Sequence, residues 1–527
     1  MNRKVLHVFF SLMIVCAVVF QLQDYSIAKG NKVPAPYVPI GFPQVVVVSG
    51  TNLEMGKQYG EQTAPAIVHN LALMKSRLYD KYGSDTVTND MKVWDYYTRL
   101  YDPGLVDWLK GIQIGCKTKG WNVSYLDMVL LMVYPSENWA RPNRPYPTET
   151  KVKVKSTSGS SSQSEDEFHA CNSFATTGNM TTDGYPVHGI TQMVAPEAMD
   201  TVILLAFPKD GASFVSQPYS GRVNGNQAMN SEGFAWTLTA ISQWGPDGGS
   251  YWGLITEVYF HYLAQIAKSP DEAIEYLMNT PRAGVTGGIT MSDGLGNIMT
   301  FECNSTVEAL RFPGDNGENG DFLVMTNHLV DPELDAAGYN PPWAGGSMAR
   351  YDAVFEYLSA VAGAGEVDFN FAKELFEANY SPGSSINQTI FLPKDLIAYL
   401  QTGTPTGNGL PAYATGEYVK IRLATDPKTV TYSAGNDASA FYWDARDSFQ
   451  SAIEDEAPYL TTDVYNDVQA KLDEAYIAIT LGSDRAGYAD LQKKQSPALW
   501  GEALTYYAKA QLYSQMAKTA LLRAAGQ

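Results

Sequence analysis

The sequence is poor in cysteine, histidine and net positive charge, and each shortage excludes a class of function. Its 527 residues include only four cysteines and six histidines, and the histidines are scattered along the chain. A histidine-rich metal site is therefore not expected. Lys and Arg number 37 against 56 Asp and Glu, a formal net charge of -19. Because polyanions bind basic surfaces, neither nucleic acid nor an anionic membrane is an expected partner.

Several common catalytic motifs are also missing. The sequence contains no GxxxxGK[ST] phosphate loop, no GxGxxG fingerprint, no GxSxG nucleophile elbow, no HExxH and no CxxC. Nucleotide-dependent chemistry, serine-hydrolase chemistry and zinc proteolysis of the usual kinds are therefore not predicted. We expect no metal and no organic cofactor. What the chain does have is apolar content, 45% of its residues, which is enough to fill a large core.

The N-terminus has the layout of an export signal. Arg3 and Lys4 precede an apolar run over residues 5–20, and small residues follow at Ser26 and Ala28. This pattern predicts a signal peptide over residues 1–28, and hence a secreted or extracytoplasmic protein with no stable membrane insertion after cleavage. The alternative is an uncleaved anchor, because the run is nearly long enough to span a bilayer. No later segment has 18 uninterrupted apolar residues.

Three further regions follow the signal. Residues 29–170 begin with a strand at 43–50 and helical patterns at 51–78, 91–101, 105–117 and 125–133, and they end in a polar, Ser-rich linker over about 136–170. Residues 171–435 are mostly strand-like, with hairpins around Asp183-Gly184 and Asp293-Gly294 and helical patterns at 251–267 and 270–279. Residues 436–527 read as about three amphipathic helices.

Cys171 stands where the linker ends and the first strand of the third region begins. Cleavage before it would make it a terminal residue, whose own α-amine can act as the base for its thiol. Such a nucleophile needs no histidine partner, in keeping with the missing motifs. The alternative is a buried structural cysteine in a strand. Cys116 and Cys303 either form a disulfide or remain as two buried thiols.

Five stretches, in order, carry a family resemblance. They are VVVVSGTNLEMGKQYGEQ (45–62), LVDWLKGIQIG with YLDMVLLMVY (105–115 and 125–134), CNSFATTGNMTTDGYPVHG (171–189), AMNSEGFAWTLTAIS (228–242) and LVMTNHLVDP (323–332). Over about residues 45–430 the chain resembles the isopenicillin-N acyltransferase-like group (acyl-CoA:6-aminopenicillanic acid acyltransferases) of N-terminal-nucleophile (Ntn) hydrolases. The nucleophile hairpin and the TNH segment together are its most specific signals.

The resemblance implies a fold and a chemistry. The fold is α+β, a four-layer αββα sandwich, here with a C-terminal helical extension. The precursor would cut itself between Ala170 and Cys171, and the two resulting chains would stay associated. Cys171 would then attack an amide or thioester, with its α-amine as general base and acid. Asn327 would stabilise the oxyanion through its side-chain amide. On position alone, an asparagine that ends a strand by bonding its own backbone is the better explanation, and the matched motif favours the oxyanion role. His328 would be a structural neighbour.

The chain departs from the family pattern at three places. Relatives carry an aspartate that orients the terminal amine, and Met193 stands there. A methionine cannot bind an ammonium, so we expect this role to be vacant or to pass to Thr191 or Gln192. A second asparagine of the family is replaced by Thr237, whose hydroxyl can still donate one hydrogen bond. A late family arginine has no match near residues 381–388.

Two functions from different classes follow. The first is an exported, self-processing amidohydrolase or acyltransferase acting on a small N-acylated amine or amino acid, with hydrolysis favoured because an exported enzyme meets little acyl-CoA. A phospholipase B-like lipid amidase is a variant of this class. The second is a catalytically impaired binding or structural protein on the same fold, in which the lost aspartate has ended turnover.

Overall fold

A computed structural model describes residues 43–133, 146–152, 170–193, 199–241, 250, 252–283, 286–318, 320–340, 345–379, 385–402, 417–492 and 496–526. The predicted signal peptide (1–28) and most of the predicted linker (136–170) lie outside these residues, as do the side chains of Ala170 and Met193. Within the described part, no helix is both long and apolar enough to cross a membrane.

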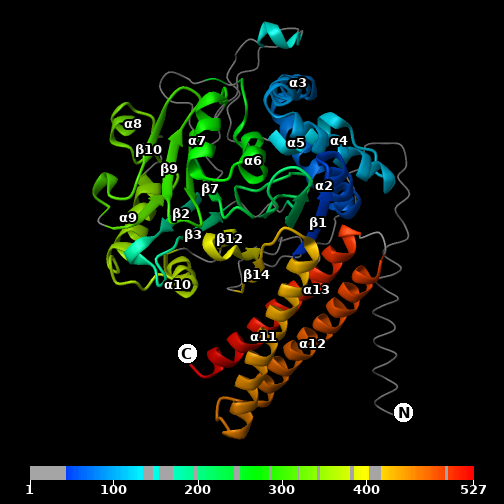
Figure 1. Cartoon of the computed structure of the whole chain (residues 1–527), viewed down its shortest axis with the longest axis vertical. Helices are drawn as coiled ribbons and strands as arrows, with labels where there is room; N and C mark the ends of the chain where they lie inside the picture. The colour runs from blue at the N-terminus through cyan, green and yellow to red at the C-terminus, as the bar shows by residue number, and fades with distance from the viewer. Residues whose placement is uncertain are drawn as a thin grey trace. The chain divides into compact units, whose positions relative to one another are not determined.

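Two β-sheets form the centre of the fold (Figure 1). The larger has the strand order β1-β4-β5-β6-β7-β8-β9-β10, and the smaller has the order β11-β2-β3-β12-β13-β14. The strands of the larger sheet are β1 (Gln44–Gly50), β4 (Val202–Pro208), β5 (Phe214–Ser216), β6 (Gln227–Asn230), β7 (Ala235–Ile241), β8 (Thr286–Ser292), β9 (Ile298–Cys303) and β10 (Glu308–Arg311). Those of the smaller sheet are β2 (Ala170–Thr176), β3 (Val187–Met193), β11 (Phe322–Met325), β12 (Ser385–Leu392), β13 (Ile397–Thr402) and β14 (Val419–Arg422).

Strands β1 and β4 form the one parallel pair among the strand pairings of the described residues, from Gln44 opposite Val202 to Gly50 opposite Pro208. Both strands are nearly continuous apolar runs, VVVV and VILLAF, and are buried on both faces. A run that is apolar at every position rather than at every second one is typical of a strand covered on both sides. The remaining pairings in both sheets are antiparallel hairpins or neighbours.

The sheets pack face to face, since β2 lies against β7 and β8, and β11 lies against β8 and β9. Helices cover the outer faces, which gives four layers, αββα, as the family resemblance implies. On the larger sheet these are α2 (Asn52–Tyr82), α3 (Ser84–Tyr101), α4 (Pro103–Thr118), α5 (Tyr125–Val133), α6 (Thr256–Gln265) and α7 (Pro270–Asn279). On the smaller sheet they are α9 (Gly345–Ser359) and α10 (Phe369–Asn379), and the short α8 (Pro332–Ala336) follows β11.

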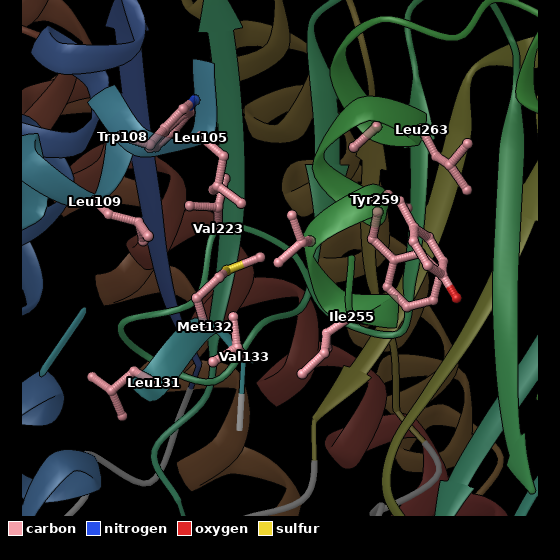
Figure 2. Close-up of a cluster of buried hydrophobic side chains, with 14 of the residues drawn as sticks. Leu105, Trp108, Leu109, Leu131, Met132, Val133, Val223, Ile255, Tyr259 and Leu263 are labelled. Atoms are coloured by element: carbon pink, nitrogen blue, oxygen red, sulfur yellow. The ribbon is translucent and has the colours of Figure 1, made fainter. Parts of the chain in front are cut away.

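The main core lies between the larger sheet and its helices. Figure 2 shows side chains from α4, α5 and α6 converging there, among them Trp108, Met132 and Tyr259. All three are less than 4% exposed. The spacing of Leu105, Trp108, Leu109 and Ile112 puts one apolar face of α4 toward the sheet.

Helices α2 and α4 approach each other unusually closely because glycines line their contact. A Cβ at Gly56 or Gly60 of α2 would clash with the backbone of α4, and a Cβ at Gly111 or Gly115 of α4 would clash with the backbone of α2. The four residues form GxxxG spacings that face one another. Here glycine is required for the approach of two backbones rather than for a turn.

The C-terminal helices α11 (Pro427–Glu454), α12 (Thr462–Leu491) and α13 (Pro497–Ala524) pack side by side (Figure 1). Helix α13 covers one edge of each sheet. Thr505 Oγ1 accepts from Val45 N of β1 at 3.0 Å. Gln511 and Gln515 pair through their side-chain amides with the N–H and C=O groups of Lys420 and Tyr418 beside and within β14. Backbone N–H and C=O groups at the edges of the two sheets are thus hydrogen-bonded by side chains of α13 instead of by another strand.

Most predicted elements are confirmed. Helix α5 has the predicted bounds, and Ser124 caps it by accepting from Asp127 N at 3.1 Å. Both predicted hairpins form, with Asp183 and Asp293 accepting from backbone N–H groups in the turns. The predicted helix at 251–267 is shorter, Thr256–Gln265, because Leu254 instead forms a bridge with Arg282. The helical tail begins at Pro427, behind the N-cap Asp426, earlier than the predicted boundary at 435.

Candidate active site

Sheet register brings Asn327 opposite Cys171. Strand β11 pairs antiparallel with β2, and Met325 lies opposite Ser173. In an antiparallel pair, the residue two positions after one partner lies opposite the residue two positions before the other partner. Asn327, just beyond β11, therefore faces Cys171 at the start of β2. Two residues that are 156 positions apart in the sequence meet because of this register.

The contact between them is a hydrogen bond from the Cys171 backbone N–H to Asn327 Oδ1, at 2.6 Å. Asn327 Nδ2 donates to Ala240 O of β7, also at 2.6 Å. Asn327 is fully buried and Cys171 is 4% exposed. An amide NH2 carries two hydrogens, so one remains on Nδ2 beyond the bond to Ala240.

The Cys171 side chain lies on the face of β2 that meets the other sheet. Alternate residues of a strand share a face, and Ser173 Oγ lies 2.6 Å from Thr237 Oγ1 of β7. Thr237 Oγ1 is also 2.9 Å from His188 Nε2, and His188 Nδ1 is 2.7 Å from Ser292 Oγ. Burial lowers the pKa of His188 to about 3, so the ring is neutral. Thr237 thus belongs to a buried hydroxyl–imidazole chain that reaches Ser173.

Strand β3 places the other predicted supporting residues in rows beside Cys171. Gln192 lies opposite Cys171, and Thr191 opposite Asn172. Directly paired residues of antiparallel strands point to the same side, so Gln192 shares the face of Cys171 and Thr191 shares the face of Asn172. The rows continue into β12 with Asn387 and Gln388. Gln388, in the segment where the family resemblance implies an arginine, accepts from Tyr418 Oη at 2.8 Å.

Sequence reasoning missed Arg350 of α9, a charged residue that bonds to both Asn327 and Asn172. Its Nη2 donates to Asn327 Oδ1 at 2.8 Å and its Nε to Asn172 Oδ1 at 3.0 Å. Asn172 is 1% exposed, and its Nδ2 has no partner among the described residues. No pattern around residue 350 signals this role, since it depends on how α9 packs on β2 and β11.

A second missed group is Tyr219, in the connection that follows β5. Its pKa is raised to about 12, chiefly by burial; Arg222 opposes the rise and the Cys171 thiol adds to it. The Tyr219 hydroxyl is therefore within electrostatic range of Cys171. The Arg222 guanidinium lies 5.4 Å from the Tyr219 ring centre, and its Nε donates to Leu131 O at 2.9 Å.

The other two described cysteines are buried free thiols and not a disulfide. Burial raises the pKa of Cys116 and of Cys303 to about 12 each. A thiol that resists ionisation is a poor nucleophile. Of the two alternatives left open by the sequence, the structure selects the pair of inert thiols.

Comparison with known proteins gives one family match and several distant relatives. Residues 183–404 match the acyl-coenzyme A:6-aminopenicillanic acid acyl-transferase family. An uncharacterized protein of Archaeoglobus fulgidus is 23% identical over 299 residues, which cover 52% of this chain and 46% of that protein. The match thus spans less than half the length of this relative.

Two solved structures show weak overall similarity. The Caenorhabditis elegans ortholog of N-acylethanolamine-hydrolyzing acid amidase is 12% identical, covers 42% of this chain and 93% of its own, and has a TM-score of 0.31. A mutant of the conjugated bile acid hydrolase from Clostridium perfringens is 12% identical, covers 48% and 97%, and has a TM-score of 0.33.

The matched region contains Asn327, Arg350 and the whole of β3, whereas Cys171 precedes it. It runs from the Asp183 turn to the end of β13 and so leaves out β2, the strand that carries Cys171 and Asn172. The family resemblance read from the sequence is confirmed as a similarity: residues 183–404 match the model of the acyl-coenzyme A:6-aminopenicillanic acid acyl-transferase family.

Proposed function

We propose that this protein is a self-processing cysteine Ntn hydrolase that cleaves the amide bond of a small N-acylated amine or amino acid. The observation that carries the proposal is the bond between the Cys171 nitrogen and Asn327 Oδ1 at the first residues of β2. It joins the predicted nucleophile, the nitrogen that processing would free and the predicted oxyanion donor in one place. The predicted export of the protein remains part of the proposal.

Processing would begin with attack of Cys171 Sγ on the carbonyl carbon of Ala170. The C–N bond between the two residues breaks, a thioester forms, and the Cys171 nitrogen takes up a proton to become an α-amine. Water then hydrolyses the thioester, which gives a carboxylate on Ala170 and a free thiol on Cys171. Before processing this nitrogen is an amide and donates to Asn327; afterwards it is a base that titrates near pH 8 in an ordinary peptide.

Turnover would use the same groups. The α-amine accepts the thiol proton as Sγ attacks the substrate carbonyl, and it passes that proton to the departing amine. The remaining N–H of Asn327 stabilises the negative charge that develops on the carbonyl oxygen. Water resolves the acyl-enzyme to a carboxylic acid. An amine in place of water would make the same site an acyltransferase.

The test is intact mass and N-terminal sequencing of the purified protein, with hydrolysis assays on a panel of N-acylated amines and amino acids of increasing acyl length. We expect two chains, one beginning Cys-Asn-Ser-Phe, and amide hydrolysis. Cys171→Ala should give a single uncut and inactive chain. Cys303→Ala removes a buried thiol from another strand and should be processed and active like the wild type.

A second candidate, a non-catalytic binding protein, rests on Met193, which stands where relatives carry an aspartate. It predicts a folded wild-type chain that stays uncut and does not hydrolyse any member of the panel. Cleavage of the chain without hydrolysis of any substrate would also favour it, because a protein can retain self-processing after it has lost catalytic turnover. Wild-type hydrolysis that is lost in Cys171→Ala would exclude it.

A further inference from the structure

Helix α9 is fastened to the segment that carries Asn327. Ser347, in its first turn, is buried and lies 2.9 Å through Oγ from both Thr326 Oγ1 and His328 Nδ1. Ser347 O also accepts from Thr326 Oγ1 at 3.1 Å. These bonds hold the two residues that flank Asn327. Arg350, one turn further along α9, is thereby set at a fixed distance from Asn327.

The guanidinium of Arg350 is oriented by all three of its nitrogen atoms. Nε donates to Asn172 Oδ1 at 3.0 Å, Nη2 to Asn327 Oδ1 at 2.8 Å, and Nη1 to Gly346 O at 3.1 Å. The Arg350 guanidinium therefore connects β2, the end of β11 and the start of α9. A planar group bound at each nitrogen has little freedom to rotate.

These contacts also decide which way the Asn327 amide faces. Arg350 and the Cys171 N–H are donors only, so the atom that both of them reach must be oxygen. Ala240 O is an acceptor only, so the atom facing it must be nitrogen. Without Arg350, the Cys171 backbone N–H would be the one donor left among the described residues to hold this oxygen in place.

We infer that Arg350 is a positioning residue of this site, which fixes the carboxamides of Asn327 and Asn172 around the Cys171 nitrogen and places a permanent positive charge beside it. This inference rests on the proposed function. It reverses the electrostatic arrangement that the family resemblance implies, in which an aspartate supports the terminal amine. In this chain Met193 is at that position, and a cation from a different element shares the amine's acceptor oxygen.

The charge has a consequence for acid–base chemistry. Arg350 Nη2 and the Cys171 nitrogen bond to one oxygen, so they lie no farther apart than the sum of those two bonds. A like charge at this range disfavours protonation of an amine. The charge of Arg350 also acts on His328. Burial and Arg311 are the larger causes that lower the His328 pKa to about 4, and Arg350 is a further one.

The other ionisable groups around the site are of both signs. Asp335 opposes the lowering of the His328 pKa, and Glu302 pairs with Arg311. Tyr219, a neutral phenol within electrostatic range of Cys171, has the cations Arg222 and Arg77 near it, and both lower its pKa. His188 and His328 are neutral near pH 7. Behind α9, Glu318 accepts from Tyr351 Oη at 3.3 Å and pairs with Arg311. Because the Arg350 guanidinium shares an acceptor oxygen with the Cys171 nitrogen, its charge favours the free-base form of the amine.

The experiment compares the pH profile of kcat/KM in processed wild type, Arg350→Gln and Arg350→Lys. Glutamine keeps an N–H donor but has no charge, and lysine keeps the positive charge but lacks the planar set of N–H donors of a guanidinium. We expect the acidic limb of Arg350→Gln to move to higher pH by about one unit, and that of Arg350→Lys to stay. Arg446→Gln, on the exposed side of α11, is the matched control and should coincide with the wild type.

The inference would be overturned if the acidic limbs of the kcat/KM profiles of wild type and Arg350→Gln coincide. It would also be overturned if Arg350→Lys folds but remains uncut while the wild type is processed. If Arg350→Gln alone stays uncut, the rate of processing replaces kcat/KM as the readout, and its loss together with rescue by Lys supports the role of charge. A wild type that is neither cut nor active would instead refute the proposed function itself.

Discussion

Two buried asparagines, Asn230 and Asn327, occupy similar surroundings and serve different purposes. Both are fully buried, and each accepts and donates through its side-chain amide. Within the described part of the chain, the Asn230 side chain bonds to backbone groups of its own turn and of the end of α6 and to no side chain. Asn327 instead bonds to the nitrogen of the predicted nucleophile and to an arginine. Burial and hydrogen bonding alone do not identify a functional residue; the chemistry of its partners does.

The largest expected effect comes from Asn327→Ala. Loss of one preorganised oxyanion donor lowers kcat by about 10²–10³-fold in comparable sites. We expect a loss of that size in amide hydrolysis, measured at a temperature where the variant is fully folded by circular dichroism. An activity within a few-fold of the wild type would show that Asn327, like Asn230, is structural.

Asn230→Ala should behave in the opposite way. It leaves the carbonyls of Ala264 and Ala267 and the N–H groups of Glu232 and Phe234 without their partner. An unsatisfied buried polar group costs about 1–3 kcal/mol, so urea denaturation should show a loss of about that size. The activity of the folded fraction should be unchanged. A loss of kcat in folded Asn230→Ala would contradict the contrast between a structural Asn230 and a functional Asn327.

A smaller effect concerns His188, whose contacts join the two sheets next to Thr237. Its pKa of about 3 lies below the usual value, so the unfolded state binds the proton more readily than the folded state. Stability from this group is therefore present above about pH 6.5 and falls as the pH drops below it, by about 1.4 kcal/mol per unit. Denaturant titrations at about pH 6 and pH 5 should show a shallower fall in His188→Gln. Parallel falls in both proteins would contradict this assignment.

Much of the fold could be predicted from local sequence. The apolar run at 45–48, the amphipathic faces of α4 and α13, and the Asp-Gly turns at 183 and 293 are signals contained within a few residues. Cys171 and Asn327 were found because each stands in a recognisable segment. Their direct contact was not predicted, because it depends on the register between β2 and β11.

Arg350 could not be predicted at all. Its role requires that α9 be fastened beside β11 through Ser347, a contact between segments that no periodicity describes. The glycine contact of α2 and α4 was overlooked for a similar reason. Each helix shows its GxxxG spacing, but only the pairing of the two reveals that the backbones approach each other there.

The position of helix α13 would have a consequence if the chain is cut before Cys171. A cut before Cys171 would leave β1 in one polypeptide and β4, together with α13, in the other. The seven paired positions of β1 and β4 and the bond from Val45 to Thr505 would then be intermolecular. Unfolding would become a dissociation, and its midpoint would rise with protein concentration. Refolding would become a second-order encounter between two fragments, so denaturation would be far harder to reverse after maturation than before it.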